Sequence, residues 1–155
     1  LLVDLINKIS SLKIKENKII GFTNGCFDLL HKGHLYSLSE AKKKCDYLIV
    51  GLQLDPSIDR PLKNSPSQSI IERYIQLKGS KHVDEIVPYV TEQDLEDILR
   101  SFKLDIRIIG DEYKEKNFTG KDFCKEKGID IYYNSRDHRF SSSGLRKQVK
   151  SAEDK

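Results

Sequence analysis

Residues 23–34 have the sequence Thr-Asn-Gly-Cys-Phe-Asp-Leu-Leu-His-Lys-Gly-His. They follow a short apolar, β-branched run at residues 18–22, and apolar residues recur at helical spacing from Leu35 to Cys45. The stretch is therefore predicted to connect a buried strand to a helix. In an open α/β sheet ligands bind outside the carboxyl ends of the strands, and the free amide groups at the start of a helix favour a phosphate.

Two imidazoles lie close together in this stretch. His31 and His34 flank Gly33, and a glycine at this point allows a ligand to come close to the backbone. Imidazole N–H groups can donate hydrogen bonds to phosphate oxygens. These residue types indicate an anion pocket at the beginning of the helix.

The remainder of the chain continues this alternation of strands and helices. Further strands are expected at residues 47–54, 83–89, 105–110 and 129–134, and helices at 32–44, 69–80, 121–127 and 144–150. Thr91-x-x-Asp94 is a capping box for another helix, which carries Leu95, Ile98, Leu99 and Phe102 at helical spacing. The pattern predicts an α/β fold: a single doubly wound domain with a parallel sheet of about five strands.

Three segments lie outside this alternation. Residues 1–17 are expected to form an N-terminal amphipathic helix that covers the sheet, with the domain at 18–150 and a tail at 151–155. Residues 55–68 contain three of the four prolines and show no helical period, which predicts a long loop. Loops of that length in compact domains are usually functional or disordered. In the helix after the loop, Ile71, Ile75 and Leu77 are expected to point inward.

Composition limits the function classes. A chain of 155 residues is long enough for one domain, and a net charge of +3 without a basic stripe gives no sign of a nucleic-acid partner. Charged residues interrupt the apolar positions of residues 1–18, and no apolar run could span a membrane. Cys26, Cys45 and Cys124 form no Cys-x-x-Cys pair, which fits reduced thiols. We expect a cytoplasmic protein without a membrane partner.

Residues 24–34, Asn-Gly-Cys-Phe-Asp-Leu-Leu-His-Lys-Gly-His, resemble the signature of the HxGH nucleotidyltransferases. This superfamily of cytidylyl- and adenylyltransferases couples a nucleoside triphosphate to a phosphorylated alcohol or sugar, and the resemblance implies a Rossmann-like fold. Glu72-Arg73-Tyr74 and the segment 83–87 are similar to the cytidylyltransferases that make CDP-glycerol, CDP-choline and CDP-ethanolamine. Asn24-Gly25 and the N-terminal helix look more like the heptose-phosphate adenylyltransferases.

Two later segments extend the resemblance. Residues 110–114, Gly-Asp-Glu-Tyr-Lys, are similar to a Gly-Asp segment of the superfamily. Residues 136–143 are similar to the Arg-Thr-x-Gly-Ile-Ser-Thr-Thr segment that the superfamily places over the triphosphate. Here Asp137 replaces Thr, Arg139 replaces Gly, and Ser142 and Ser143 replace Thr. Serine keeps the hydroxyl donors, so phosphate binding is expected to survive the replacements.

The resemblance implies a reaction and a set of site residues. An acceptor phosphate oxygen attacks the α-phosphorus in line and pyrophosphate leaves, so the site must neutralise and align two anions. Lys63 would close over the α-phosphate as its loop orders. The catalytic residues implied are His31, His34, Lys63 and Arg136. The nucleotide-binding residues implied are Thr23, Asn24, Gly25, Cys26, Phe27, Gly33, Asp111, Ser141 and Ser142.

The sequence gives less information about the residues that bind the acceptor and the metal. Asp28 and Arg73 are implied as substrate-binding residues, and Mg²⁺ or another divalent cation is expected, with Asp28 the nearest carboxylate. Each has a structural alternative, since Asp28 could cap the following turn, Lys63 could be solvated, and Arg73 could pair with Glu72 or Asp84. A homodimer is expected by analogy with the superfamily.

Three functions remain open at this stage. The first transfers CMP from CTP to a phosphorylated alcohol or polyol such as glycerol 3-phosphate, and the alternative is an adenylyltransferase that uses ATP and a heptose 1-phosphate. A third, a non-catalytic nucleotide-binding module, predicts the loss of a phosphate-binding group. His31, His34, Lys63 and Arg136 are all present, which favours an enzyme.

Overall fold

The computed structural model describes residues 2–135 and 140–155. It contains one sheet of five parallel strands in the order β3-β2-β1-β4-β5. The strands are β1 (Ile20–Gly25), β2 (Tyr47–Gln53), β3 (Glu85–Tyr89), β4 (Ile106–Gly110) and β5 (Asp130–Asn134). The helices are α1 (Leu2–Glu16), α2 (Lys32–Lys42), α3 (Ile70–Lys78), α4 (Glu92–Ser101), α5 (Lys121–Lys127) and α6 (Ser142–Glu153), and a 3₁₀ turn η1 spans Asp111–Tyr113. The predicted doubly wound α/β fold is confirmed.

The order of the strands reverses at β1, the central strand. β1 pairs with β2 along its whole length, from Ile20 beside Tyr47 to Gly25 beside Leu52, and it pairs with β4 on its other edge. The connections from β1 and from β4 therefore leave the sheet in opposite directions. Such a switch point opens a crevice outside the carboxyl ends of the strands, where α/β proteins bind their ligands.

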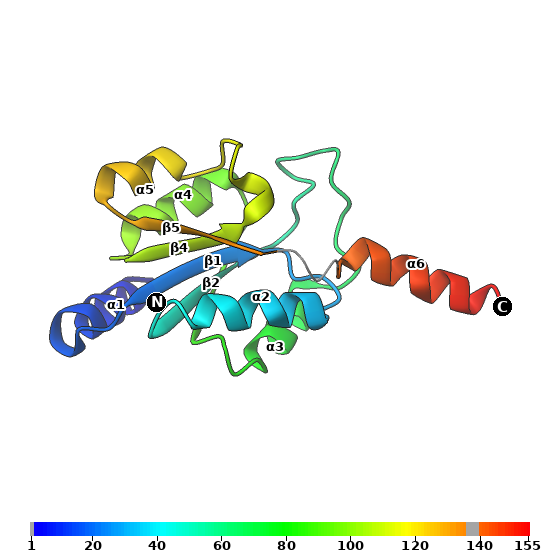
Figure 1. The fold of residues 1–155 in the computed structure, drawn as a ribbon, viewed down its shortest axis with the longest axis horizontal. Coiled ribbons are helices and arrows are strands. Elements are labelled where there is room, and N and C mark those ends of the chain that lie inside the picture. Colours follow the sequence, from blue (N-terminus) through cyan, green and yellow to red (C-terminus); the bar gives the residue numbers. More distant parts are fainter. Residues whose placement is uncertain (1, 136–139) are drawn as a thin grey trace.

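Helices cover both faces of the sheet (Figure 1). α2 and α3 lie on one face, where Leu38, Leu77 and Val50 belong to one apolar cluster. α4 and α5 lie on the other face, where Leu99 and Phe123 belong to a second cluster. Because both faces are covered, the strands are apolar along most of their length.

The N-terminal helix lies at the amino ends of the strands (Figure 1). Its Ile9 is fully buried in the apolar cluster of α4 and α5. Lys13 forms an ion pair with Asp105, just before β4, and Lys8 lies 3.6 Å from the carboxylate of Glu85 at the start of β3. The predicted amphipathic helix is thus present and covers the sheet end opposite the crevice.

Two helices differ from the sequence-based expectation. Ile71 and Ile75 are 68% and 64% exposed, so the prediction that they point inward is wrong, whereas the inward position of Leu77 is correct. The capping box of Ser69 and Glu72 fixes the start of α3, and in the resulting helical phase Arg73 is buried beside Leu77. The last helix continues to Glu153, so it includes most of the expected tail.

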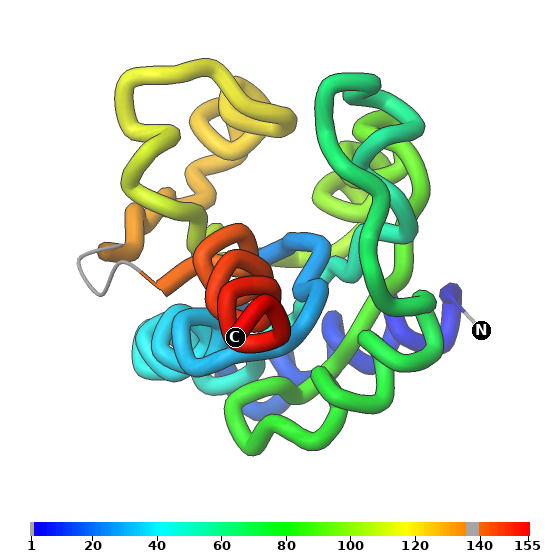
Figure 2. The backbone as a smooth tube through the Cα atoms, turned by 90° about the vertical axis from the view of Figure 1, so that its right-hand side faces the viewer, coloured from blue at the N-terminus to red at the C-terminus, as the bar shows by residue number. Residues whose placement is uncertain are grey.

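α6 extends beyond the carboxyl ends of the strands (Figure 1). Seen from that end, it stands between the loop at residues 54–69 and the segment that follows β4 (Figure 2). None of its residues is buried. Among the described helices, none combines the length and the apolar character that a membrane crossing requires.

Candidate active site

A cavity of about 490 Å³, here called the main cavity, opens at the carboxyl ends of the strands. Its walls come from the end of β1, the residues after it, the loop at 54–69, the segment after β4 and the start of α6. Five residues predicted to bind nucleotide line it: Thr23, Asn24, Gly25, Cys26 and Phe27. The strand-to-helix connection predicted from the sequence therefore lies at one opening of the fold.

The two histidine rings lie against each other, tilted by 33°, at the N-terminus of α2. Their ring centroids are 3.9 Å apart. His31 is the N-cap, and its Nδ1 accepts from the Gly33 N–H at 3.0 Å, while Nδ1 of His34 accepts from the His31 N–H at 3.2 Å. Because each Nδ1 accepts a hydrogen bond, the proton of each neutral ring is on Nε2.

The two rings occupy different positions. His34 lines the main cavity, with its ring 5.5 Å from that of Phe27. His31 does not line the cavity; its Nε2 lies 3.3 Å from the hydroxyl of Ser142, which does. The arrangement places His34 where it can donate to a ligand and places His31 behind it, as part of the connection to α6.

Gly33 is required by packing inside the protein. A Cβ atom at this position would lie 2.8 Å from Cε1 of His31 and 2.9 Å from Cβ of Phe140. Gly33 is buried and does not line the main cavity. The glycine therefore lets the His31 ring fold back onto the helix, and the close approach of a ligand to this residue stays a prediction.

The serine-rich start of α6 reaches the histidine pair. The Ser142 hydroxyl donates to the Asp28 carbonyl at 3.1 Å, and Ser142 and Ser143 line the cavity. Ser141 is instead the exposed N-cap of α6, with its hydroxyl accepting from the Gly144 N–H at 3.0 Å. Arg136, predicted to hold the leaving phosphates, lies outside the described residues.

Asp28 joins three segments of the chain. Its carboxylate, 5% exposed, accepts from the backbone N–H groups of Ser67 at 2.8 Å and Gln68 at 2.9 Å, and it forms an ion pair with Arg146. Burial by itself would raise the pKa of Asp28, but the two N–H donors and the guanidinium outweigh it and lower the pKa below the ordinary value. These partners surround both carboxylate oxygens.

Metal-ligating side chains do not cluster in the part of the chain that the structure describes. Among residues 2–135 and 140–155, no group of three or more His, Cys, Asp or Glu side chains is placed to hold an ion. Asp28, the carboxylate expected nearest to Mg²⁺, already accepts from three donors. No step of the chemistry is therefore assigned to a metal ligated by these side chains.

The loop at residues 54–69 is tied down near both of its ends. Ser67 and Gln68 bind Asp28, while Asp59 accepts from the Glu92 N–H at 2.5 Å and Arg60 lies 3.2 Å from the Glu92 carboxylate. Lys63 lies between these two attachments, exposed and at the wall of the main cavity. The loop therefore presents a lysine to the cavity, as the sequence suggested.

Arg73 has a structural role. It is 2% exposed and does not line the main cavity. Its guanidinium donates to the carbonyls of Gln53 at 2.6 Å, Leu54 at 2.5 Å, Cys26 at 3.0 Å and Gln68 at 3.1 Å. It thereby fixes the carboxyl ends of β1 and β2, and the prediction that it binds substrate is not supported.

Of two other predicted residues, Asp111 differs from expectation and Cys26 agrees with it. Asp111 is exposed and does not line the main cavity, because the 3₁₀ turn directs its neighbours Glu112 and Tyr113 there instead. Burial raises the pKa of the Cys26 thiol, which keeps it protonated at neutral pH. Cys26 is thus a wall of the cavity and not a nucleophile.

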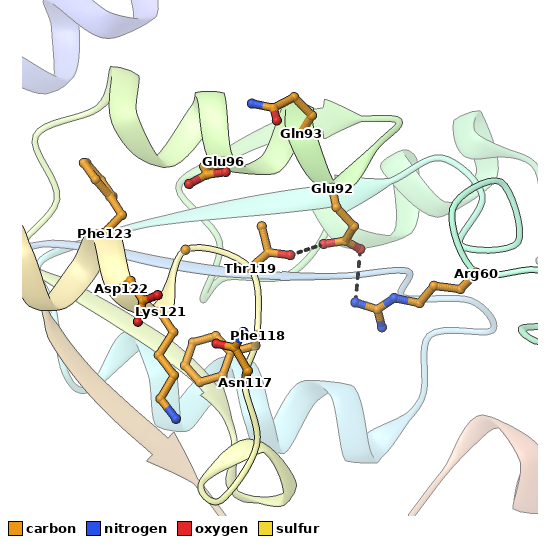
Figure 3. A pocket seen from close by; sticks show the side chains of 11 residues that line it. Arg60, Glu92, Gln93, Glu96, Asn117, Phe118, Thr119, Lys121, Asp122 and Phe123 are labelled. Carbon is orange, nitrogen blue, oxygen red and sulfur yellow. Dashed lines mark hydrogen bonds and ion pairs between the residues drawn. The ribbon is translucent and has the colours of Figure 1, made fainter.

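Sequence reasoning missed several polar residues of the cavity. Arg107 is 1% exposed, and Tyr89 and Asn134 are also buried. A charged residue inside the apolar run Ile-Arg-Ile-Ile was the available signal for Arg107. A neighbouring cavity, shown in Figure 3, shares Arg60, Glu92, Phe118 and Thr119 with the main cavity.

Known proteins share this sequence and fold. The chain is 40% identical over 114 residues to "Bifunctional protein HldE" of Helicobacter hepaticus, covering 73% of this chain and 23% of that protein. It is 35% identical over 143 residues to the protein of the same name in Campylobacter concisus, covering 91% of this chain and 29% of that protein. The chain thus spans about a quarter of the length of these curated relatives.

Solved structures agree with the fold. The lipopolysaccharide core biosynthesis protein of Thermoplasma volcanium matches with a TM-score of 0.60 and 26% identity, over 76% of this chain and 95% of that one. The pantoate-β-alanine ligase of Francisella tularensis shares the fold at 17% identity, with a TM-score of 0.59 over 91% of this chain and 73% of that one. The family model described as cytidylyltransferase-like matches residues 22–148. This match covers most of the chain and includes His34 at the wall of the main cavity, so the chain belongs to the cytidylyltransferase-like family of nucleotidyltransferases.

Proposed function

We propose that this chain transfers an adenylyl group from ATP to the phosphate of a heptose 1-phosphate and releases pyrophosphate. The observation that carries the proposal is the meeting of two helix N-termini at one cavity. α2 begins beside the paired rings of His31 and His34, and the hydroxyl of Ser142, the first residue of α6, lies 3.3 Å from Nε2 of His31. The imidazole of His34, the hydroxyl of Ser143 and the first backbone amides of α6 are placed there to donate to phosphate oxygens.

Such a site accelerates the reaction by aligning charges. The acceptor phosphate is already an anion at neutral pH, so no side chain has to remove a proton from it. Donation by His34 and the helix amides would stabilise the charge that grows on the α-phosphate oxygens. Lys63 would add a positive charge from the loop, and Arg136 would hold the leaving pyrophosphate. Magnesium is expected only as the counter-ion that the triphosphate substrate brings with it.

Two considerations favour ATP and a sugar phosphate over CTP and glycerol 3-phosphate. Asn24-Gly25 and the N-terminal helix resemble the heptose-phosphate adenylyltransferases, and curated relatives bear the name HldE. A structural relative is described as a lipopolysaccharide core biosynthesis protein, which accords with a sugar acceptor. The resemblance to the CDP-alcohol enzymes rested partly on Arg73, whose guanidinium is occupied by backbone carbonyls.

Pyrophosphate release tests the assignment. The chain is incubated with each of the four nucleoside triphosphates, crossed with heptose 1-phosphate, glycerol 3-phosphate and other phosphorylated polyols. Turnover with ATP and heptose 1-phosphate supports the proposal, and turnover with CTP and glycerol 3-phosphate alone supports the other candidate. No turnover with any pair contradicts both. Sedimentation of the same preparation tests the homodimer that the resemblance implies.

A further inference from the structure

One wall of the main cavity is a connected network of polar side chains, here called the polar wall. It consists of Asn24, Tyr89, Glu92, Arg107 and Thr119, all of which line the cavity. These residues come from β1, β3, α4, β4 and the segment before α5, so tertiary folding brings them together. Of these five residues, only Asn24 is among those that the resemblance implies for nucleotide binding.

Hydrogen bonds fix the geometry of the polar wall. Asn24 Nδ2 donates to the Tyr89 hydroxyl at 3.1 Å and its Oδ1 accepts from Arg107 at 3.4 Å. Arg107 also donates to the Thr119 carbonyl, and the Thr119 hydroxyl donates to Glu92 at 2.8 Å. Figure 3 shows Glu92 between Thr119 and Arg60. A network held in this way is rigid before a ligand arrives.

Four buried polar atoms around the main cavity, three that can donate and one that accepts, have no partner in the part of the protein that the structure describes. Among the described residues, the buried side-chain polar atoms without a hydrogen-bond partner are Ser37 Oγ, Gln53 Nε2, Arg107 Nε and Asn134 Oδ1, and all four residues line the main cavity. Buried polar groups are nearly always paired, so this concentration points to a ligand. Gln53 is the direct strand neighbour of Tyr89 and lies beside the wall.

The hydroxyl group of Tyr89 is a further hydrogen-bond donor. Its side chain is 4% exposed, and its hydroxyl oxygen accepts from Asn24, but no described residue accepts the hydroxyl hydrogen. Burial raises the pKa of Tyr89 to about 12, so the hydroxyl stays protonated at neutral pH. The wall thus offers donors at Tyr89 and Arg107 and an acceptor at Glu92, and the adjacent Gln53 adds a further donor.

In an in-line transfer the acceptor and the leaving pyrophosphate lie on opposite sides of the α-phosphorus, which determines which of the two substrates faces the polar wall. The groups that would hold the leaving phosphates lie at the start of α6, beside α2. The nucleophile must approach from the opposite side of the phosphorus. The polar wall lies on the face of the sheet that carries α4 and α5, since Tyr89 packs in the same cluster as Leu95 and Leu99.

We propose that the polar wall is the acceptor subsite, where Tyr89 and Gln53 donate hydrogen bonds to the hydroxyl groups of a phosphorylated sugar. The inference rests on the proposed function, whose acceptor it locates. Sugar hydroxyls both donate and accept, which matches a wall that offers donors beside a carboxylate. Tyr89 and Gln53 are therefore specificity-determining residues for the acceptor and not for the triphosphate.

The test is Tyr89→Phe, which removes one hydroxyl and leaves the ring in the core. The acceptor KM should rise about three- to tenfold, the loss of one hydrogen bond, while the triphosphate KM stays within about twofold. With the wild-type enzyme, a heptose 1-phosphate that lacks the contacted hydroxyl should have an acceptor KM raised by the same factor. With Tyr89→Phe, loss of that hydroxyl should raise the acceptor KM by a smaller factor. Tyr74→Phe is the matched control: Tyr74 packs against the α2 and α3 cluster and lines neither cavity, so both KM values should be unchanged.

The outcomes separate this inference from the proposed function. A rise in the triphosphate KM alone, or no change in either KM, overturns the acceptor subsite while the enzyme assignment stands. If wild type releases no pyrophosphate with any substrate pair, the proposed function fails. Calorimetry of heptose 1-phosphate binding to the wild type and to Tyr89→Phe then tests the acceptor subsite without turnover. Weaker binding by the variant supports the subsite. Equal binding by both proteins, or binding by neither, overturns it.

Discussion

The carboxylate of Asp28 accepts a hydrogen bond from the guanidinium of Arg146, although 118 positions separate the two residues in the chain. Asp28 follows β1 and Arg146 lies in the second turn of α6. The same carboxylate binds the end of the loop at 54–69 through Ser67 and Gln68. Three segments that surround the main cavity therefore depend on one buried anion.

Replacing that anion tests its structural role. Asp28→Asn should lower the free energy of unfolding by about 1–3 kcal/mol, because an amide is neutral and can accept from fewer of the three donors. The folded-state pKa of Asp28 lies below the unfolded value of about 3.9, so its stabilisation is complete above that value and is lost as the pH falls through the folded-state pKa. Denaturant unfolding from pH 7 to pH 2 should show the difference between wild type and variant shrinking toward acid. A difference that stays constant with pH would contradict this assignment.

The histidine that lines the cavity is expected to act in the chemical step. His34→Asn keeps an acceptor near the position of Nδ1, so that the His31 N–H can stay paired, but it removes the Nε2 donor. Turnover should fall on the order of a hundredfold or more if that donor stabilises the transition state. Pyrophosphate release measures the effect, with His82→Ala, outside the main cavity, as control. A rate unchanged by His34→Asn would remove this residue from the mechanism.

Lys63 should affect activity without affecting stability. It is exposed on the loop at 54–69, so Lys63→Ala should change the free energy of unfolding by less than about 0.5 kcal/mol. Turnover should fall at least about tenfold, because the loop loses the positive charge that it presents to the phosphates. Lys81→Ala, an exposed lysine that lines neither cavity, should change neither quantity. Full activity of Lys63→Ala would show that Lys63 is a solvated surface lysine without a role in the reaction.

Arg73 should behave in the opposite way. Arg73→Leu leaves four backbone carbonyls without their donor, so the free energy of unfolding should fall by at least about 2 kcal/mol. The exposed Arg100 serves for comparison: its pair with Glu96 on α4 is solvated, and Arg100→Leu should cost less than about 0.5 kcal/mol. Thermal or denaturant unfolding measures both. A variant Arg73→Leu of normal stability with a raised acceptor KM would restore the substrate-binding role.

Local rules predicted the elements near the site well. The capping box of Thr91 and Asp94 forms, and Gly128 ends α5 in the left-handed conformation. The loop at 54–69 is present because its prolines and turn residues cannot continue a helix. These features depend on residues a few positions apart, which is why the sequence alone reveals them.

Positions within the site were harder to predict. Nothing in the neighbourhood of Arg73 or Asp111 in the chain tells whether the side chain faces the cavity, and neither of them lines it. Arg107 stands out as a charge in an apolar run, but the run does not tell what the charge faces, and a tyrosine in a strand such as Tyr89 has no local signature of binding. Their significance arises from neighbours such as Asn24 and Thr119, which other segments supply.

The sequence by itself determined the order of strands and helices, the strand-to-helix junction with its two histidines, and hence the family, because short-range periodicity and residue chemistry carry that information. Tertiary structure decided which polar side chains meet. It directed the carboxylate of Asp28 to backbone amides and Arg146, placed Arg73 under the strand ends, and assembled the polar wall from five separate elements. Contacts between residues far apart in the chain depend on how the layers pack against one another, and no local pattern specifies that packing.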